Sequence, residues 1–185
     1  MLILASASPR RRQLLTEYGY RFRVEPADIE EVMPPDLTVA EITLLNARLK
    51  ALAVAEKNPA ALVIGVDTLV ALDGICLGKP ADMEEAFAML SRLNGRIHEV
   101  HSAIWAARAS TSTHRALVEV SRVKFRALDE AEIRRYMARI HPLDKAGAYA
   151  AQDDGPEGII ESVEGSRTNV VGLPMEALAK MLEAF

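Results

Sequence analysis

The chain of 185 residues is predicted to fold as one α/β domain built on a mixed β-sheet. Apolar, β-branched runs of strand length alternate with segments whose apolar residues recur at helical spacing. Two long apolar runs, residues 97–107 and 116–125, are separated by a Ser/Thr-rich loop around residues 110–113, which indicates an antiparallel pair. A purely parallel sheet is therefore not expected. We find no internal repeat or linker, so residues 1–185 are expected to form a single domain.

Capping residues and helix breakers set the expected elements. Ser8 is a good N-cap and Pro9 suits the first helical position, so a helix over residues 9–18 should follow a short buried strand at 2–5. Thr38 and Glu41 have the spacing of a capping box and should open a long helix to about residue 57. The remaining pattern predicts strands at 21–25, 62–72 and near 158–163, and helices that begin at Asp82, at Asp129 and near Pro174.

Two finer expectations concern packing. The helix that Asp82 caps should turn one apolar face to the core, formed by Met83, Ala86, Phe87, Leu90 and Leu93. In the strand at 116–125 the apolar phase shifts between Val120 and Val123, which predicts a β-bulge.

Composition excludes several classes of protein. The formal net charge is −4, so the whole molecule lacks the basic field of a nucleic-acid binder. No apolar run approaches the roughly 18 residues that cross a bilayer, and the arginines follow the apolar N-terminal stretch instead of preceding it, unlike a secretion signal. Cys76 is the single cysteine, so no disulfide can form within the chain, and a reducing cytoplasm is the expected location.

The first turn of the first helix carries an unusual run of charge. Arg10, Arg11 and Arg12 follow Ser8 and Pro9, where the positive end of the helix dipole disfavours cations. Free backbone N–H groups point the same way, so this turn is predicted to bind an anion, and a phosphate suits it best. The alternative is a solvated basic turn that tolerates the mismatch.

Asp67 stands inside the apolar strand at 62–72. An ionised carboxylate there is costly unless it is paired, hydrogen-bonded or bound to metal. This indicates a catalytic or metal-binding aspartate, and the alternative is a structural aspartate paired with a nearby lysine or arginine.

Other polar positions give weaker signals. Lys79, after Gly78, could hold a phosphate, although most lysines in such loops are solvated. Lys50 stands at the edge of the apolar stripe of the long helix, and extension of its amine to water is the simplest account of it. Glu30 and Glu31 lie in an acidic loop that is usually solvated. Gln152, in a loop of small residues, offers a donor and acceptors that suit a base edge, although an ordinary loop explains it too. The four histidines lack metal-ligand spacing.

Taken together, the motifs resemble those of the Maf family of nucleotide pyrophosphatases over nearly the whole chain. Each motif alone is weak, but their order is specific. They are Leu4-Ala5-Ser6-Ala7-Ser8-Pro9-Arg10-Arg11, Gly65-Val66-Asp67-Thr68, Gly78-Lys79-Pro80, Asp144-Lys145-Ala146-Gly147-Ala148-Tyr149 with Gln152, and Glu164-Gly165-Ser166 leading into Asn169-Val170-Val171-Gly172-Leu173-Pro174.

The resemblance implies an elongated mixed sheet flanked by helices, of the Maf/ITPase type, with two lobes and a central nucleotide-binding cleft. It also implies a homodimer and a need for Mg²⁺ or Mn²⁺. It makes Asp67 the general base and a metal ligand, with Glu31 as the second acidic metal position. The positions that match the family's substrate-binding residues are Ser8, Arg11, Lys50 and Lys79.

Three positions that separate the family's branches are Arg10, Thr68 and Gln152 here, and this combination resembles the branch that acts on dTTP and UTP. Ile29-Glu30-Glu31 stands where many members have Asp-Glu, which leaves open whether Glu30 or Glu31 faces the site.

The expected activity is hydrolysis of dTTP and UTP, with modified pyrimidine nucleotides as further candidates, to the monophosphate and pyrophosphate. One alternative is a pyrophosphatase for 7-methyl-GTP or another purine triphosphate. The other is a nucleotide-binding regulator of cell division with little turnover. The acids beside the basic turn favour an enzyme, since a binding protein has little use for Asp67.

Overall fold

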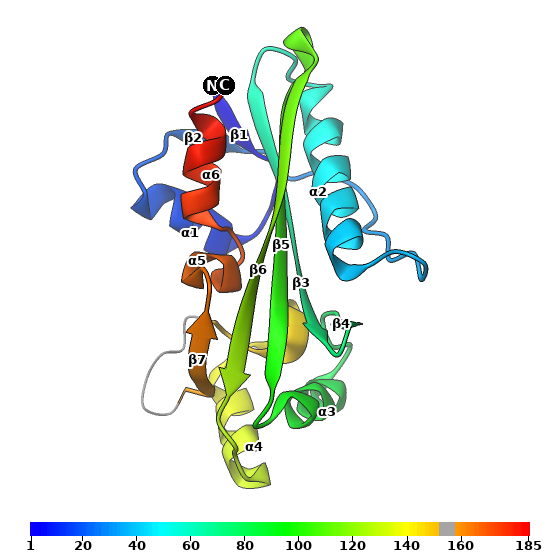
Figure 1. The fold of residues 1–185 in the computed structure, drawn as a ribbon, viewed down its shortest axis with the longest axis vertical. Helices are drawn as coiled ribbons and strands as arrows, with labels where there is room; N and C mark the ends of the chain where they lie inside the picture. Colours follow the sequence, from blue (N-terminus) through cyan, green and yellow to red (C-terminus); the bar gives the residue numbers. More distant parts are fainter. Residues whose placement is uncertain (152–157) are drawn as a thin grey trace.

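A computed structural model describes residues 1–151 and 158–185, and its backbone is one sheet with helices packed around it (Figure 1). The strand order is β2-β1-β3-β5-β6-β7, and β4 pairs with β3 off this path. The strands are β1 (Leu2–Leu4), β2 (Phe22–Val24), β3 (Leu62–Leu72), β4 (Ile75–Leu77), β5 (Ile97–Arg108), β6 (Thr113–Phe125) and β7 (Ile160–Glu164).

The sheet is mixed, as predicted. β1 runs parallel to both β2 and β3, whereas the pairs β3–β4, β3–β5, β5–β6 and β6–β7 are antiparallel. β3, β5 and β6 have 11, 12 and 13 residues and form the long axis of the molecule. At about 3.3 Å per residue each spans roughly 36–43 Å, which gives the elongated shape in Figure 1.

The helices group at the two ends of these long strands (Figure 1). We call β1, β2 and the helices around them the first lobe, and β4, β7 and the helices near them the second lobe. The first lobe contains α1 (Pro9–Glu17), α2 (Val39–Ala55) and α6 (Met175–Leu182), and the second contains α3 (Met83–Leu93) and α4 (Glu130–Arg139). The short α5 (Arg167–Val171) lies between β7 and α6 in the chain, and three 3₁₀ turns cover Ala109–Thr111, Pro142–Asp144 and Ala146–Ala148.

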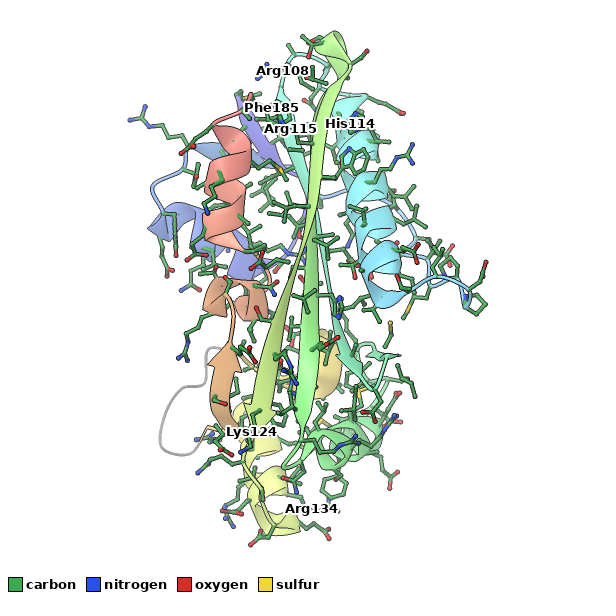
Figure 2. The ribbon with its side chains drawn as sticks, in the orientation of Figure 1. Arg108, His114, Arg115, Lys124, Arg134 and Phe185 are labelled. Carbon is green, nitrogen blue, oxygen red and sulfur yellow. The ribbon has the colours of Figure 1, made fainter. Side chains whose placement is uncertain are left out.

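Each lobe has its own apolar core, and side chains fill the space between sheet and helices (Figure 2). Along β3 the side chains alternate between the two faces. Ile64 and Val66 pack with Leu178 of α6, whereas Val63 packs with Val54 of α2. The second lobe is built around a separate cluster that includes Leu72, Leu90, Leu93, Phe125 and Tyr136.

The main elements were predicted with ends within a few residues of those observed, but one finer prediction was wrong and another was confirmed only in part. The predicted core face of α3 is confirmed for Ala86, Leu90 and Leu93, which are buried, and for Phe87, which packs against the same core. Met83 is instead 47% exposed, because it stands at the first helical position of α3, and Met89 is buried in addition. β6 pairs with β5 in unbroken register past Val120 and Val123. The apolar phase shifts there because Ser121 is buried and donates to the Ser166 carbonyl, while the register irregularity lies at Lys124/Phe125 against β7.

The short helix α5 was not predicted. It begins after Ser166, whose side chain accepts from the amide of Asn169, and it ends at Gly172 in the left-handed region with φ of 119°. No helix among the described residues is both long and apolar enough to span a bilayer.

Candidate active site

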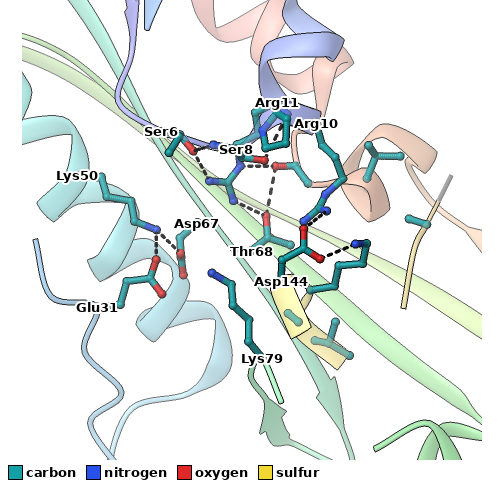
Figure 3. A pocket seen from close by; sticks show the side chains of 18 of the residues that line it. Ser6, Ser8, Arg10, Arg11, Glu31, Lys50, Asp67, Thr68, Lys79 and Asp144 are labelled. Carbon is teal, nitrogen blue, oxygen red and sulfur yellow. Dashed lines mark hydrogen bonds and ion pairs between the residues drawn. The ribbon is translucent and has the colours of Figure 1, made fainter. Parts of the chain in front are cut away.

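A pocket of about 410 Å³ opens between the two lobes (Figure 3). The turn between β1 and α1, the loop before α2, β3, and the segments around Lys79 and Asp144 form its walls. Every predicted site residue in the described part of the chain lines it, namely Ser8, Arg10, Arg11, Glu31, Lys50, Asp67, Thr68 and Lys79. Gln152, the remaining predicted position, lies outside the described residues.

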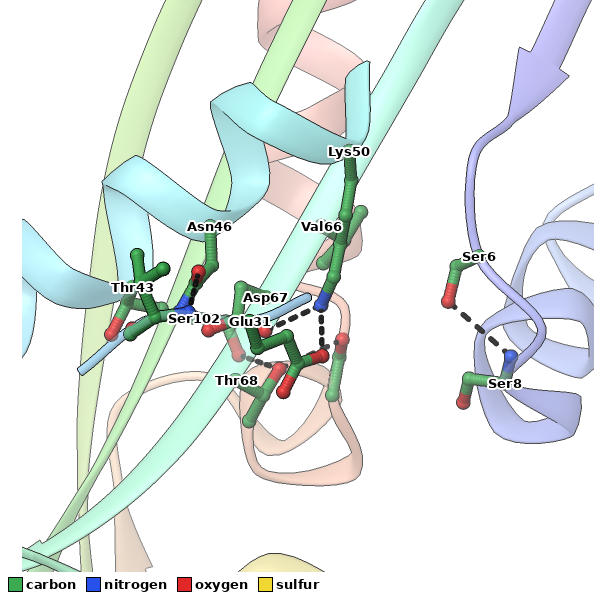
Figure 4. Close-up of polar contacts among 12 residues, drawn as sticks. Ser6, Ser8, Glu31, Thr43, Asn46, Lys50, Val66, Asp67, Thr68 and Ser102 are labelled. Atoms are coloured by element: carbon green, nitrogen blue, oxygen red, sulfur yellow. Dashed lines mark hydrogen bonds and ion pairs between the residues drawn. The ribbon is translucent and has the colours of Figure 1, made fainter. Parts of the chain in front are cut away.

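Two carboxylates share one lysine in this pocket (Figures 3 and 4). The Lys50 ammonium donates to Asp67 Oδ1 at 2.7 Å and to Glu31 Oε1 at 2.6 Å. Asp67 is 4% exposed and Lys50 is 9% exposed. Lys50 therefore does not extend to water, which was the alternative for this residue. Its charge offsets the cost of burying the Asp67 carboxylate.

A close approach of helix to strand brings Lys50 to Asp67. Both Gly65 and Asp67 face α2, since side chains two apart on a strand share a face. A Cβ on Gly65 would lie 2.1 Å from the Ala47 carbonyl oxygen and 2.5 Å from the Ala51 amide nitrogen. Only glycine permits this contact, and Lys50 stands next to Ala51 on the helix.

Asn46 decides which acid of the loop faces the site. Its side chain accepts from the Val32 amide and donates to the Val32 carbonyl, each at 2.9 Å, so the segment after Glu31 is fixed to α2 (Figure 4). Asn46 precedes Lys50 by one helical turn and lies on the same face. Glu31 consequently lines the pocket, whereas Glu30 is exposed and is not among the lining residues of the described chain.

The positive charges of the pocket act on Glu31 together. Partial burial raises the pKa of Glu31, but the hydrogen bond and charge of Lys50, with the charges of Lys79 and Arg11, outweigh that effect. The net pKa is below the ordinary glutamate value. Glu31 therefore stays ionised although its side chain is only 51% exposed.

Asp67 retains one unused acceptor. Its Oδ2 atom is buried and has no hydrogen-bond partner among the described residues. A buried carboxylate oxygen without a partner is costly, and such an atom in a pocket is suited to a bound cation or water. The described residues contain no cluster of three or more metal-ligating side chains. Three carboxylates line the pocket in the described chain, and Asp144 is paired with Arg10 and Lys145, so Asp67 and Glu31 are the two that lie together beside Lys50.

Arg11 is buried and bonded mainly to the protein itself. Its Nε donates to the Gly172 carbonyl at 2.9 Å, Nη1 donates to Ser6 Oγ and the Val66 carbonyl at 2.9 Å, and Nη2 donates to Thr68 Oγ1 at 3.1 Å. A guanidinium has five N–H donors, so four are engaged. Burial lowers the pKa of Arg11, although the negative charges of Asp67 and Glu31 oppose this effect.

The three arginines of the basic turn therefore play different parts. Ser8 caps α1 by accepting from the Arg11 amide, as predicted. Arg10 lines the pocket and pairs with Asp144 at 3.7 Å, whereas Arg12 is exposed and is not among the lining residues of the described segments. Of the three arginines, Arg10 thus lines the pocket with a partly exposed side chain and an ion-pair partner at 3.7 Å.

Thr68 is committed to an internal network. Its hydroxyl accepts from Arg11, shares a hydrogen bond of 2.8 Å with Ser102, and lies 3.3 Å from the Gly172 carbonyl. One donor and two lone pairs leave little capacity for a further partner. Thr68 therefore shapes the pocket through its position between Arg11 and Ser102.

Sequence reasoning missed several neighbours of these residues. Asn46 gave a signal, because it is a polar residue on the apolar face of a helix, one turn before Lys50. Ser102 and the Gly172 carbonyl gave none, since long-range contacts across the sheet bring them to Thr68. The four histidines, all within the described part, are absent from the pocket lining.

Comparisons with known proteins agree with this architecture. The family model described as "Maf-like protein" matches residues 1–185. A dTTP/UTP pyrophosphatase of Pelotomaculum thermopropionicum is 48% identical, covering 100% of this chain and 96% of that protein. A dTTP/UTP pyrophosphatase of Akkermansia muciniphila is 46% identical, covering 98% of this chain and 94% of that protein.

Among solved structures, the Ham1 protein of Staphylococcus aureus superposes with a TM-score of 0.54 at 16% identity, covering 99% of this chain and 98% of that one. At this identity the likeness concerns the fold alone, and it matches the predicted elongated, two-lobed mixed sheet. The full-length family match and the two relatives lead to one conclusion: the chain belongs to the Maf family.

Proposed function

We propose that this protein hydrolyses dTTP and UTP at the bond between the α and β phosphates, releasing the nucleoside monophosphate and pyrophosphate. The relatives named dTTP/UTP pyrophosphatase support the substrate class. The observation that carries the proposal is Asp67, a buried carboxylate in a pocket that also contains Lys50, Lys79, Arg10 and Arg11.

The residues present fit a divalent cation. Mg²⁺ is commonly held by one or two carboxylates together with substrate phosphates and water, and Asp67 and Glu31 supply that pair. The unpartnered Oδ2 of Asp67 and the ionised Glu31 would hold the ion, so we propose Mg²⁺ or Mn²⁺ as cofactor. When bound, such an ion neutralises charge on the triphosphate oxygens.

The protein's own groups can carry the remaining chemistry. Asp67 accepts a proton from a water molecule, whose oxygen forms a bond to the α-phosphorus while the bond from that phosphorus to the bridging oxygen breaks. Pyrophosphate leaves with the bridging oxygen. Lys79, Arg10 and the N–H groups that follow Ser8 stabilise its negative charge, and Lys50 holds Asp67 in place.

We propose that Arg11 acts on this site indirectly, without binding the substrate. With four donors bonded to protein atoms, it supplies charge to the pocket and fixes the turn before α1 against β3 and Gly172. The family resemblance made Arg11 a phosphate ligand, and we propose instead that Arg10 makes the direct contact.

Base selection is assigned to three positions. Arg10 has a partly exposed side chain at the pocket and can contact a substrate directly. Thr68 can select the base through the shape that it gives the pocket, because its hydroxyl is already hydrogen-bonded within the protein. Gln152 completes the proposed set on the resemblance alone.

The test is a panel of nucleotides assayed side by side with Mg²⁺ or Mn²⁺. We expect dTTP and UTP to be turned over fastest, with one pyrophosphate released per monophosphate. Release of inorganic phosphate and a diphosphate would overturn the assignment of the bond. Preference for 7-methyl-GTP or inosine triphosphate would overturn the substrate class, and tight binding without turnover would favour a regulator.

We further propose a homodimer located in the cytoplasm, on the basis of the family resemblance and the single Cys76. Light scattering of the purified protein across a dilution series tests the dimer, and a constant monomer mass would exclude it.

A further inference from the structure

The mechanism above makes no use of His98, a buried titratable side chain. His98 lies in β5, is 2% exposed, and stands outside the residues that line the pocket in the described chain. We infer that His98 is a positioning residue, which holds Tyr149 and through it the pocket wall formed by residues 144–151. This inference rests on the proposed function for its kinetic readout only.

His98 forms a closed cluster of three rings with Phe125 and Tyr149. The His98 ring lies edge-to-face against Phe125 at 4.7 Å and against Tyr149 at 5.3 Å, and Phe125 and Tyr149 meet at 4.9 Å with an angle of 89°. Edge-to-face contacts depend on the relative orientation of the two rings, so they favour one orientation of each ring. The cluster therefore fixes the ring of Tyr149, which lines the pocket on its other side.

A hydrogen bond joins the histidine to the tyrosine. His98 Nε2 and the Tyr149 hydroxyl are 3.0 Å apart, and both groups are buried. Burial lowers the pKa of His98 to about 4 and raises that of Tyr149, so both side chains are neutral at neutral pH. The contact is therefore a hydrogen bond between neutral groups.

The wall that Tyr149 anchors is tied at two further points. The Ala150 amide donates to the Tyr136 hydroxyl at 2.9 Å, and the Gly147 amide donates to the Gly78 carbonyl at 3.0 Å. The second bond fixes the residue directly before Lys79. A displacement of Tyr149 would thus move Lys79 as well as residues 144–151.

Gly147 leaves this wall little freedom to adapt. Its φ is 70°, and a Cβ there would lie 3.1 Å and 3.2 Å from the two γ-methyl groups of Val70. The wall is consequently packed tightly against β3 near Gly147, and the His98–Tyr149 bond holds its far end. Losing that bond should loosen substrate contacts without removing any group that takes part in the chemistry.

The experiment compares His98→Leu, Tyr149→Phe and His98→Gln. The first two remove the hydrogen bond, and the glutamine amide can restore a polar group close to the position of Nε2. We expect KM for dTTP and UTP to rise about 10-fold in His98→Leu and about 5-fold in Tyr149→Phe, with kcat within about 2-fold. His98→Gln should recover much of the loss, and the double variant should be no worse than His98→Leu.

A second readout needs no turnover, so it separates this inference from the proposed function. Hydrogen exchange at the amides of Gly147 and Ala150 should become faster in His98→Leu and Tyr149→Phe, because both amides donate from the anchored wall. If the wild type hydrolyses neither dTTP nor UTP, the exchange result still decides the role of His98.

His114 provides the matched control. It stacks on Trp105 at 4.7 Å near the tip of the β5–β6 hairpin, far from the second lobe (Figure 2). His114→Leu should change neither KM nor exchange at Gly147 and Ala150. The inference is overturned if His98→Leu and Tyr149→Phe lower thermal stability while KM and exchange stay at wild-type values. It is also overturned if kcat falls and KM does not move.

Discussion

Two polar centres, each built around a buried side chain, flank the pocket, and they differ in charge. The first consists of Lys50, Asp67 and Glu31, and the second of His98 and Tyr149. Each contains one buried polar atom without a partner among the described residues, Asp67 Oδ2 in the first and His98 Nδ1 in the second. Asp67 lines the pocket, so a bound species can satisfy its oxygen, whereas His98 lies behind Tyr149.

This difference in charge matches the two proposed roles, since the charged centre takes part in the reaction and the neutral centre positions the pocket wall. An ionised group is suited to a site where charge changes during the reaction, and the cost of burying Asp67 is offset by the charge of Lys50. A neutral histidine holds a ring at lower cost because neither it nor its partner must be buried as an ion.

The largest effect is expected from Asp67→Asn. Asparagine keeps the size of the side chain but cannot accept a proton, so turnover should fall about 100-fold or more. Binding of a non-hydrolysable nucleotide should change much less. Steady-state kinetics with a pyrophosphate assay gives the comparison, and near-wild-type turnover would remove Asp67 from its role as base.

Gly65→Ala should damage the same centre without touching a charge. The added methyl group meets backbone atoms of Ala47 and Ala51, so α2 must move and carry Lys50 away from Asp67. Overpacking of this kind costs about 3 kcal/mol, which corresponds to a fall in Tm of about 10 °C for a chain of this size. We expect kcat to fall at least about 10-fold.

A second substitution checks the cause. Adding Ala51→Gly removes only one of the three nearest atoms, the Ala51 Cβ at 2.9 Å, and leaves both backbone contacts. The double variant should therefore remain as inactive as Gly65→Ala. Recovery of activity in it, or wild-type melting of the single variant, would show that the helix does not depend on Gly65.

The two centres also differ in how well the sequence predicted them. Asp67 and the start of α1 each broke a local rule, such as a charge in an apolar strand, and such conflicts can be recognised without a structure, whereas Lys79 gave only a weak signal. Their meeting in one pocket came from the family resemblance. The bond of His98 to Tyr149 joins residues 51 positions apart, and no local pattern in the chain predicts it.

The same contrast holds for the fold. Caps and apolar periods located nearly every element, because these signals are local. The strand order β2-β1-β3-β5-β6-β7 and the bulge position depend on contacts across the sheet. Ser121 misled the prediction because a buried serine, bonded to the Ser166 carbonyl, cannot be told from an exposed one by polarity.

The neutral centre should make the stability of the folded protein depend on pH, through His98. The pKa of His98 is about 4 in the folded protein against 6.5 ordinarily, because burial disfavours the charged ring. Above pH 6.5 the ring is neutral in both states. As the pH falls from 6.5 to 4 the unfolded chain gains a proton that the native state does not bind, so stability falls, by an amount that approaches about 3 kcal/mol.

His98→Gln isolates this effect, because glutamine does not titrate. Urea unfolding of both proteins between pH 7 and pH 4.5 should show a steeper loss of stability in the wild type. The shifted carboxylates, such as Glu31, are common to both proteins and cancel in the difference. Parallel curves would mean that His98 is not buried as a neutral ring.

The smallest effect is expected at the mouth of the pocket. Asp144 and Arg10 form an ion pair at 3.7 Å, and Asp144 also accepts from Lys145. Partial burial raises the pKa of Asp144, but Lys145 and Arg10 outweigh this, so the carboxylate is ionised and repels a triphosphate. Asp144→Asn should lower KM about 2- to 3-fold, since exposed pairs contribute about 0.2–1 kcal/mol, and the change should shrink at high salt.

Asp73→Asn is the matched control for this charge. Asp73 pairs with Arg96 at 2.7 Å in the turn before β4, and neither residue is among those that line the pocket in the described chain. Asparagine tolerates the left-handed backbone at this position, where φ is 53°. A similar fall in KM in both variants would assign the effect to net charge. A rise in KM in Asp144→Asn alone would mean that Asp144 holds Arg10 in the orientation that binds substrate.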